Sequence, residues 1–147
     1  MIESPVHNNK SVHETRCRVR YAETDQMGVV YYANYYVWME IGRVELVRSL
    51  GINYHELERI DGLLLSVVES HCRYMAPARY DQEIIVATTI ADSNARLVEF
   101  HYNIRNAETN QPLARGGTKH MWVNRQFKPT RLPFRYLQIL RQNQPEI

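Results

Sequence analysis

The sequence is poor in the residues that hold small or exported proteins together. Among its 147 residues are only two cysteines, Cys17 and Cys72, and they form no C-x-x-C pair. This scarcity argues against a disulfide framework and a zinc ribbon, and it favours the reducing cytoplasm. No apolar run approaches the roughly 18 residues of a membrane span, and the polar residues 1–15 lack the apolar stretch of a signal peptide. We therefore expect a soluble, cytoplasmic protein that engages no membrane.

Charge of one sign is also scarce, because the formal net charge is only +2 at pH 7. So small a charge does not favour nucleic acid binding. Basic residues do gather in the last third of the chain: Arg115, Lys119, Arg125, Lys128, Arg131, Arg135 and Arg141. This bias suits a small molecule that bears phosphate at least as well, so we expect no nucleic acid partner.

Motifs of several enzyme classes are missing as well. The sequence contains no G-x-S-x-G, no P-loop, no G-x-G-x-x-G and no H-E-x-x-H. Its six histidines show no ligand spacing, so no metal site is expected. Cys17 shares a strand pattern with Val19, which indicates a small buried side chain and not a nucleophile, and Cys72 is interpreted in the same way.

At this length the chain is most simply one domain. Residues 1–14 are polar and lack periodicity, so we expect a flexible N-terminal segment followed by a single domain over residues 15–147. From Arg16 to Tyr21, basic and apolar side chains alternate. This alternation predicts a strand with its apolar side on the core.

A long helix is expected next. It should begin between Ala33 and Tyr35, with Asn34 as a candidate N-cap, and end near Leu50. Apolar residues occupy most directions around its axis, which predicts burial on several sides. A glycine inside a helix costs about 1 kcal/mol relative to alanine, so we expect another backbone to pack closely against Gly42.

The second half of the chain shows strand patterns separated by turn residues. Strands are predicted over Leu63–Met75, Glu83–Ala91, Ala95–Asn106 and Leu113–Asn124. A short helix is predicted from Pro133 to Leu140. This separation of helix and strands predicts the α+β class, with one antiparallel sheet wrapped around the long helix.

One stretch combines an acid, a glycine and several tyrosines just before the long helix: residues 25–35, which read DQMGVVYYANY. A carboxylate that faces a helix N-terminus can serve hydrolysis, because free backbone N–H groups and the helix dipole stabilise a developing oxyanion. From local sequence alone, Asp25 could equally cap a turn.

The stretch resembles the signature of hotdog-fold acyl-CoA thioesterases of the 4-hydroxybenzoyl-CoA thioesterase type. Their pattern is an Asp, two variable residues, Gly-(Ile/Val)-Val, an aromatic residue, Tyr or His, one variable residue, Asn or Ser, and Tyr. The resemblance extends over nearly the whole chain and includes the segment Tyr74-x-x-Pro-Ala-Arg-Tyr-Asp81. It implies a hotdog fold, in which the sheet wraps a central helix, and a homodimer or homotetramer with acyl-CoA at the subunit interface. CoA is then part of the substrate, and no separate cofactor is expected.

The resemblance also implies roles for particular residues. Asp25 would be the catalytic carboxylate, either as nucleophile towards the thioester carbonyl or as general base for water. The backbone N–H of Tyr32 would polarise the thioester oxygen, with Gly28 allowing the loop to approach closely. Tyr31 and Asn34 are candidates for substrate contacts. Many relatives have His in place of Tyr32, whereas tyrosine occurs there in the aromatic-acyl branch, so an aromatic or short acyl group is expected.

The phosphates of CoA require basic side chains near the site. Lys128 follows the last predicted strand, where relatives place a basic residue, and Arg96 is a second candidate. Glu23 lies two residues before Asp25, and we expect it to be solvated. Tyr35, Tyr36 and Trp38, together with Tyr31, line an acyl pocket or simply pack in the core.

Three functions fit this reading. The first is an acyl-CoA thioesterase that releases a free acid and CoA. The second is a thioesterase that acts on acyl carrier protein thioesters. The third is a non-catalytic hotdog domain that binds acyl-CoA or a protein, and the acid at Asp25 counts against it.

Overall fold

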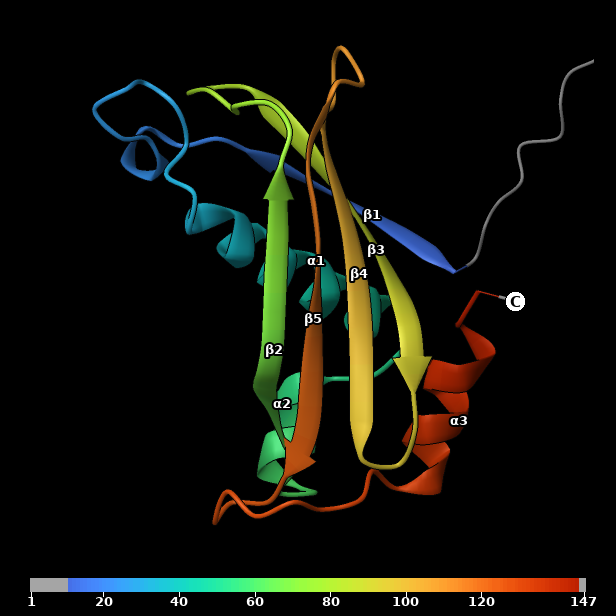
Figure 1. The fold of residues 1–147 in the computed structure, drawn as a ribbon. Coiled ribbons are helices and arrows are strands. Elements are labelled where there is room, and N and C mark those ends of the chain that lie inside the picture. The colour runs from blue at the N-terminus through green and yellow to red at the C-terminus, as the bar shows by residue number, and fades with distance from the viewer. Residues whose placement is uncertain (1–10, 146–147) are drawn as a thin grey trace, which may run out of the picture.

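An antiparallel sheet of five strands curls around one long helix in the computed structural model, which describes residues 11–145 (Figure 1). The elements in chain order are β1 (Val12–Arg18), the 3₁₀ turn η1 (Tyr21–Glu23), α1 (Asn34–Ser49), α2 (Tyr54–Arg59), β2 (Leu64–Tyr74), β3 (Glu83–Ser93), β4 (Leu97–Asn106), β5 (Pro112–Val123) and α3 (Phe134–Gln142). The strands lie in the order β1-β3-β4-β5-β2, so β1 and β2 are the edges. The expected α+β class and the four expected later strands are confirmed.

The first strand begins earlier than predicted. Pairing of Val12 with Thr89 opens β1, whereas the sequence placed residues up to 14 in a flexible segment; residues 1–10 lie outside the described part of the chain. Val19 is buried, as expected, whereas Cys17 is only partly buried. The prediction for Tyr21 was wrong: its side chain is 77% exposed, because β1 ends at Arg18 and η1 turns the chain away from the sheet.

The long helix α1 has the predicted limits, but its first turn differs. Ala33 takes the N-cap position, and Asn34 is the first helical residue. The side chain of Asn34 does not cap the helix, because its Nδ2 donates to the backbone oxygen of Glu23 at 2.8 Å. One side of α1 is buried, whereas Val37 and Ile41 are 42% and 38% exposed. Burial on several sides is therefore not achieved within one chain.

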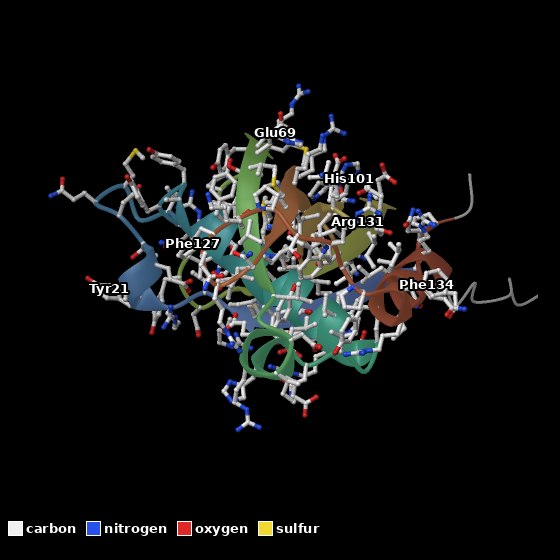
Figure 2. All side chains as sticks on the ribbon, turned by 90° about the horizontal axis from the view of Figure 1, so that it is seen from below. Tyr21, Glu69, His101, Phe127, Arg131 and Phe134 are labelled. Carbon is white, nitrogen blue, oxygen red and sulfur yellow. The ribbon has the colours of Figure 1, made fainter. Side chains whose placement is uncertain are left out.

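The core lies between α1 and the inner face of the sheet. Strand β4 shows this most clearly, because Val98, Phe100, Tyr102 and Ile104 are each at most 1% exposed and alternate with more exposed neighbours. The side chains of Glu69 and His101 project from the opposite, outer face (Figure 2). This alternation is that of a sheet with one face on a core.

A close approach to Gly42 is found, but it is made by side chains of β3 and not by a backbone as predicted. A Cβ atom at Gly42 would lie 2.5 Å from Thr88 Oγ1 and 2.8 Å from Val86 Cγ1 of β3. Overpacking of this kind costs about 1–3 kcal/mol, which exceeds the about 1 kcal/mol gained in helix propensity. We expect Gly42→Ala to lower the melting temperature in thermal unfolding, and Thr88→Ala in the same chain to restore part of the loss. A Gly42→Ala protein at least as stable as wild type would contradict this packing.

A polar cluster crosses the core beneath α1. Thr118 Oγ1 hydrogen-bonds both to the hydroxyl of Tyr102 and to Nε2 of His120, each at 2.7 Å. The His120 side chain is fully buried, and its Nδ1 has no hydrogen-bond partner among the described residues. Burial, with a smaller effect of the Arg43 charge, lowers the pKa of His120 from 6.5 to about 4.

This lowered pKa predicts a pH-dependent stability. The unfolded chain takes up the His120 proton below about pH 6.5 but the folded chain only near pH 4, so the contribution of His120 is complete above pH 6.5 and is lost as the pH falls towards 4. The loss approaches roughly 3 kcal/mol. Denaturant unfolding from pH 7 to pH 4 should show this decline, and His120→Gln should flatten it. His55→Gln, at an exposed position, is the matched control. Equal slopes for wild type and His120→Gln would contradict the assignment.

Candidate functional site

The acid singled out in the sequence lies in a tight loop between η1 and α1. Asp25 Oδ1 accepts a hydrogen bond from the backbone N–H of Met27 at 2.8 Å, and its backbone oxygen accepts from Gly28 N at 3.0 Å. Gly28 has a φ of 77°, which favours glycine. Apart from its two neighbours in the chain, no atom of residues 11–145 lies within 4 Å of the position that a Cβ would take at Gly28. Within one chain, this glycine is therefore needed for its backbone conformation, and a close approach to it is not seen.

Asp25 opens onto a cavity of about 350 Å³. The lining residues are Asp25, Met27, Val29, Val30, Tyr32, Tyr35, Tyr74, Met75, Ala76 and Pro77. Asp25 is the one carboxylate in this lining, and the other side chains are apolar or tyrosine. Such a setting suits a site where a single acid meets an apolar substrate group.

Three tyrosines form one wall of this cavity. The hydroxyl of Tyr74 donates to the backbone oxygen of Tyr32 at 3.0 Å, and the two rings meet edge to face with centroids 6.3 Å apart. The rings of Tyr35 and Tyr74 meet at 5.0 Å, and Tyr35 Oη accepts from Ala78 N. Desolvation raises the pKa of the Tyr74 hydroxyl, followed by its contact with Cys72, so the group stays protonated and can donate.

Tyr74 was not among the predicted site residues. The signal that could have found it is the alternation of β2, which puts Tyr74 on the same face as the partly buried Cys72. Its contact with Tyr32, 42 positions earlier in the chain, depends on the tertiary fold and could not be predicted from the local sequence.

The backbone N–H of Tyr32 is available for a ligand. Tyr31 N donates to Glu23 O, and Asn34 N donates to Tyr31 O, whereas Tyr32 N has no hydrogen-bond acceptor within residues 11–145. The group lies in the last turn before α1, where an unpaired N–H can stabilise negative charge on an oxygen.

The other predicted substrate-binding residues lie outside the cavity lining. Asn34 and Tyr31 are next to it, but the Asn34 amide is engaged by Glu23 O, and the Tyr31 ring packs against Tyr32 at 4.8 Å. Arg96 lies in the β3–β4 turn and Lys128 in the loop after β5, at the end of the sheet opposite the Asp25 loop (Figure 1). One chain does not bring them to Asp25.

The interpretation of Glu23 as a solvated acid was wrong. Its side chain is 6% exposed, and its carboxylate accepts hydrogen bonds from the Trp38 indole at 2.9 Å and from Arg20 N at 2.8 Å. Trp38 is itself 1% exposed, and its ring packs edge to face against Tyr35 at 4.9 Å. Trp38 therefore belongs to the core, whereas Tyr35 serves the core and the cavity together.

Three other features of the described chain bear on the site. A larger depression of about 520 Å³ adjoins β1 and β3, but its Arg16 and Arg18 are already paired with Glu83. Residues 11–145 contain no group of three or more His, Cys, Asp or Glu side chains placed to hold a metal ion. In the same part of the chain, every helix is too short or too polar to cross a bilayer.

Comparison with known proteins identifies a family whose sequences this chain resembles. Residues 19–140 match the model of the thioesterase-like superfamily. A Bacillus subtilis protein named "Putative acyl-CoA thioesterase YneP" is 40% identical over 119 residues, which cover 80% of this chain and 85% of that protein. The acyl-acyl carrier protein thioesterase ATL3 of Arabidopsis thaliana is 30% identical over 121 residues, covering 82% of this chain and 63% of ATL3.

Solved structures agree on the fold. DHNA-CoA thioesterase from Staphylococcus aureus superposes with a TM-score of 0.82 at 29% identity, over 90% of this chain and 87% of that one. A 4-hydroxybenzoyl-CoA thioesterase superposes with a TM-score of 0.80 over 88% of this chain and 99% of the other. At 14% identity, this similarity supports the fold and not a function. The expected hotdog fold is confirmed.

Proposed function

We propose that this chain, which belongs to the thioesterase-like superfamily, hydrolyses the thioester bond of an acyl-CoA to a free acid and CoA. One observation carries the proposal: Asp25 is the single carboxylate lining a cavity of about 350 Å³ beside the start of α1. The relatives support the enzyme class, because YneP and the Staphylococcus aureus protein are both named as thioesterases of acyl-CoA compounds. Water is the only co-substrate, so no cofactor is needed.

Asp25 has two possible roles in this reaction. As a general base it takes a proton from water, whose oxygen attacks the thioester carbonyl while the CoA thiolate leaves and is protonated. As a nucleophile it forms an acyl-aspartate anhydride with loss of CoA thiolate, and water then hydrolyses the anhydride. In both cases the free N–H of Tyr32 stabilises the oxyanion that develops on the carbonyl.

The cavity wall favours a flat aromatic or short acyl group. Tyr32, Tyr35 and Tyr74 present ring surfaces to the cavity, and aromatic groups pack well against such edges and faces. Met27 and Met75 complete the lining with flexible side chains that adapt to different shapes. Tyr31 and Asn34 support this wall from outside it, through the Tyr32 ring and the Glu23 carbonyl.

We also propose that the active form is a homodimer or a tetramer built from such dimers. The edge strand β2 is 11 residues long, and Val67 and Val68 on it are 56% and 43% exposed. A long edge strand that exposes apolar side chains is a template for pairing with another strand. The exposed Val37 and Ile41 of α1 give the same second copy an apolar helix face to cover.

Pairing of two β2 edges about a two-fold axis would also complete the site. Two β2 strands that pair about a two-fold axis run antiparallel. The Leu64 end of β2 in one subunit would then lie beside the Tyr74 end of β2 in the other. The Leu64 end pairs with Val123, just before the loop that carries Lys128. Lys128 and Arg96 would then reach the substrate held by the other subunit and bind its phosphates.

A cytoplasmic location is part of the proposal, because both cysteines are free thiols in the structure and thiols persist in reducing compartments.

A second function is favoured by the similarity to acyl-acyl carrier protein thioesterases, among them ATL3 at 30% identity. The two proposals are separated by thiol release from aromatic, short and long acyl-CoAs and from the same acyl groups on acyl carrier protein. Turnover of acyl-CoA with a higher kcat/KM than the matching carrier protein substrate supports the first proposal. The reverse preference supports the second, and tight acyl-CoA binding without thiol release would identify a binding domain.

A further inference from the structure

We infer that Glu23 is a positioning residue that fixes Asp25 relative to the first turns of α1. The inference rests on the proposed role of Asp25 and deepens it. Both oxygens of the buried Glu23 carboxylate are occupied: Oε1 accepts from Arg20 N at 2.8 Å, and Oε2 accepts from Trp38 Nε1 at 2.9 Å. The Arg20 guanidinium lies 3.5 Å from Oε1 on the exposed side.

The backbone of Glu23 is held as firmly as its side chain. Its carbonyl oxygen accepts from Tyr31 N at 2.9 Å and from Asn34 Nδ2 at 2.8 Å. Glu23 thus joins η1, the Tyr31–Tyr32 turn and the helix α1 at one point. These contacts bind the two ends of the loop that contains Asp25, because Glu23 precedes that loop and Tyr31 follows it.

Asp25 follows Glu23 after a single residue. Thr24 between them is itself fixed, because its Oγ1 donates to Tyr21 O at 2.7 Å and its backbone forms a bridge with Val30. Two consecutive Cα–Cα steps of about 3.8 Å therefore connect Glu23 to Asp25. A shift of Glu23 would therefore be transmitted to Asp25 through one intervening residue, whereas Tyr32 is also held by the hydrogen bond from the Tyr74 hydroxyl to its backbone oxygen.

A buried carboxylate at position 23 is better explained by the positioning of Asp25 than by a gain in folding stability. Burying a carboxylate is costly, and replacing buried charged groups with apolar residues of similar size is often neutral or stabilising. What a carboxylate adds is direction, because its two oxygens require two N–H groups at defined positions. Catalytic groups gain most from such fixing, since a displacement of about 1 Å can lower the rate 100-fold.

Glu23→Gln tests the inference with a nearly isosteric side chain. The amide offers one oxygen for two N–H donors, so its NH₂ group must face either Arg20 N–H or the Trp38 indole N–H. We expect kcat for acyl-CoA hydrolysis to fall about 10- to 100-fold while KM stays within about two-fold. Arg20→Ala is the matched control, because it removes the guanidinium and keeps the backbone N–H, and its kcat should stay near the wild-type value.

A rescue separates positioning from folding. Trp38→Phe removes the indole N–H donor. In the double variant Glu23→Gln/Trp38→Phe, the one side-chain amide oxygen at position 23 has only the Arg20 N–H to accept from. We expect the double variant to have a higher kcat than Glu23→Gln alone. If Glu23→Gln does not fold, Trp38→Phe alone should lower kcat with little change in KM. An unchanged kcat in Glu23→Gln, or in Trp38→Phe where that variant is used, would overturn the inference.

The hydrogen bond between Glu23 and Trp38 also has a readout that does not depend on turnover. The Trp38 indole N–H gives its own resonance in ¹⁵N-labelled protein, identified by its loss in Trp38→Phe, and it should shift in Glu23→Gln. If wild type hydrolyses no acyl thioester while this resonance shifts, the proposed function fails and the hydrogen bond stands. If wild type is active and neither the resonance nor kcat responds to Glu23→Gln, the inference fails and the proposed function stands.

Discussion

Replacement of Asp25 with asparagine is expected to lower kcat for acyl-CoA hydrolysis by about 10²- to 10⁴-fold. Asparagine retains the Oδ1 oxygen that accepts from Met27 N at 2.8 Å, so the turn at Gly28 should persist. It cannot take up a proton from water or form an anhydride in the manner of a carboxylate. KM should change little, because the apolar cavity that holds the acyl group is intact.

Steady-state thiol release at saturating acyl-CoA measures this effect. Asp81→Asn is the matched control: it removes a carboxylate from an exposed position with a φ of 67°, which asparagine tolerates. This control should keep near wild-type kcat. Similar losses in the two variants would mean that the fall reflects general charge or folding, and not the chemistry of Asp25.

Placing charges on the free edge of β2 is expected to have the second largest effect. Val67→Lys together with Val68→Lys brings like charges together if two β2 strands pair. The dimer should dissociate to monomers in analytical ultracentrifugation. Activity should fall about 100-fold, because each site would lose the basic groups contributed by the other subunit and with them the orientation of CoA.

The control for this change is Phe134→Lys. Phe134 is 72% exposed on α3, which lies apart from β2 (Figures 1 and 2), so the substitution adds charge at an apolar surface position without touching the proposed interface. Its mass and kcat should match wild type. A Val67→Lys/Val68→Lys protein that remains dimeric would place the interface elsewhere, and an active monomer would show that one chain holds a complete site.

The order of elements could be predicted because it depends on local periodicity. The alternation of β4 is a property of a short segment. The same reasoning failed where the chain leaves regular structure, as at Tyr21, which continues an alternating pattern after β1 has ended. It also treated α1 as buried on several sides, whereas Val37 and Ile41 remain open in one chain.

The site was predictable in part. Asp25, Gly28 and Tyr32 lie within one contiguous motif, so the sequence itself brings them together. Glu23 was misjudged because its burial depends on Trp38, 15 positions away, and on the fold of the intervening loop. Tyr74 was missed because it lies on β2, far from the Asp25 motif in the sequence, and reaches the cavity only through the tertiary fold.

Lys128 and Arg96 show a different limit. Lys128 was predicted near the substrate by resemblance and Arg96 as a second basic candidate, yet both lie at the end of the sheet away from Asp25 (Figure 1). The proposed pairing of two β2 strands would reconcile the prediction with this distance, because the second chain would run in the opposite direction. Residues that act across a subunit boundary leave no periodicity or spacing in the sequence of one chain.

The most direct measurement of the central claim is CoA thiol release by wild type and Asp25→Asn, assayed side by side on aromatic, short and long acyl-CoAs. The proposed function predicts turnover of at least one acyl-CoA by wild type and almost none by Asp25→Asn on that same substrate. No turnover by wild type on any of them, or equal rates for the two proteins, would contradict the claim that Asp25 hydrolyses acyl-CoA in the cavity beside α1.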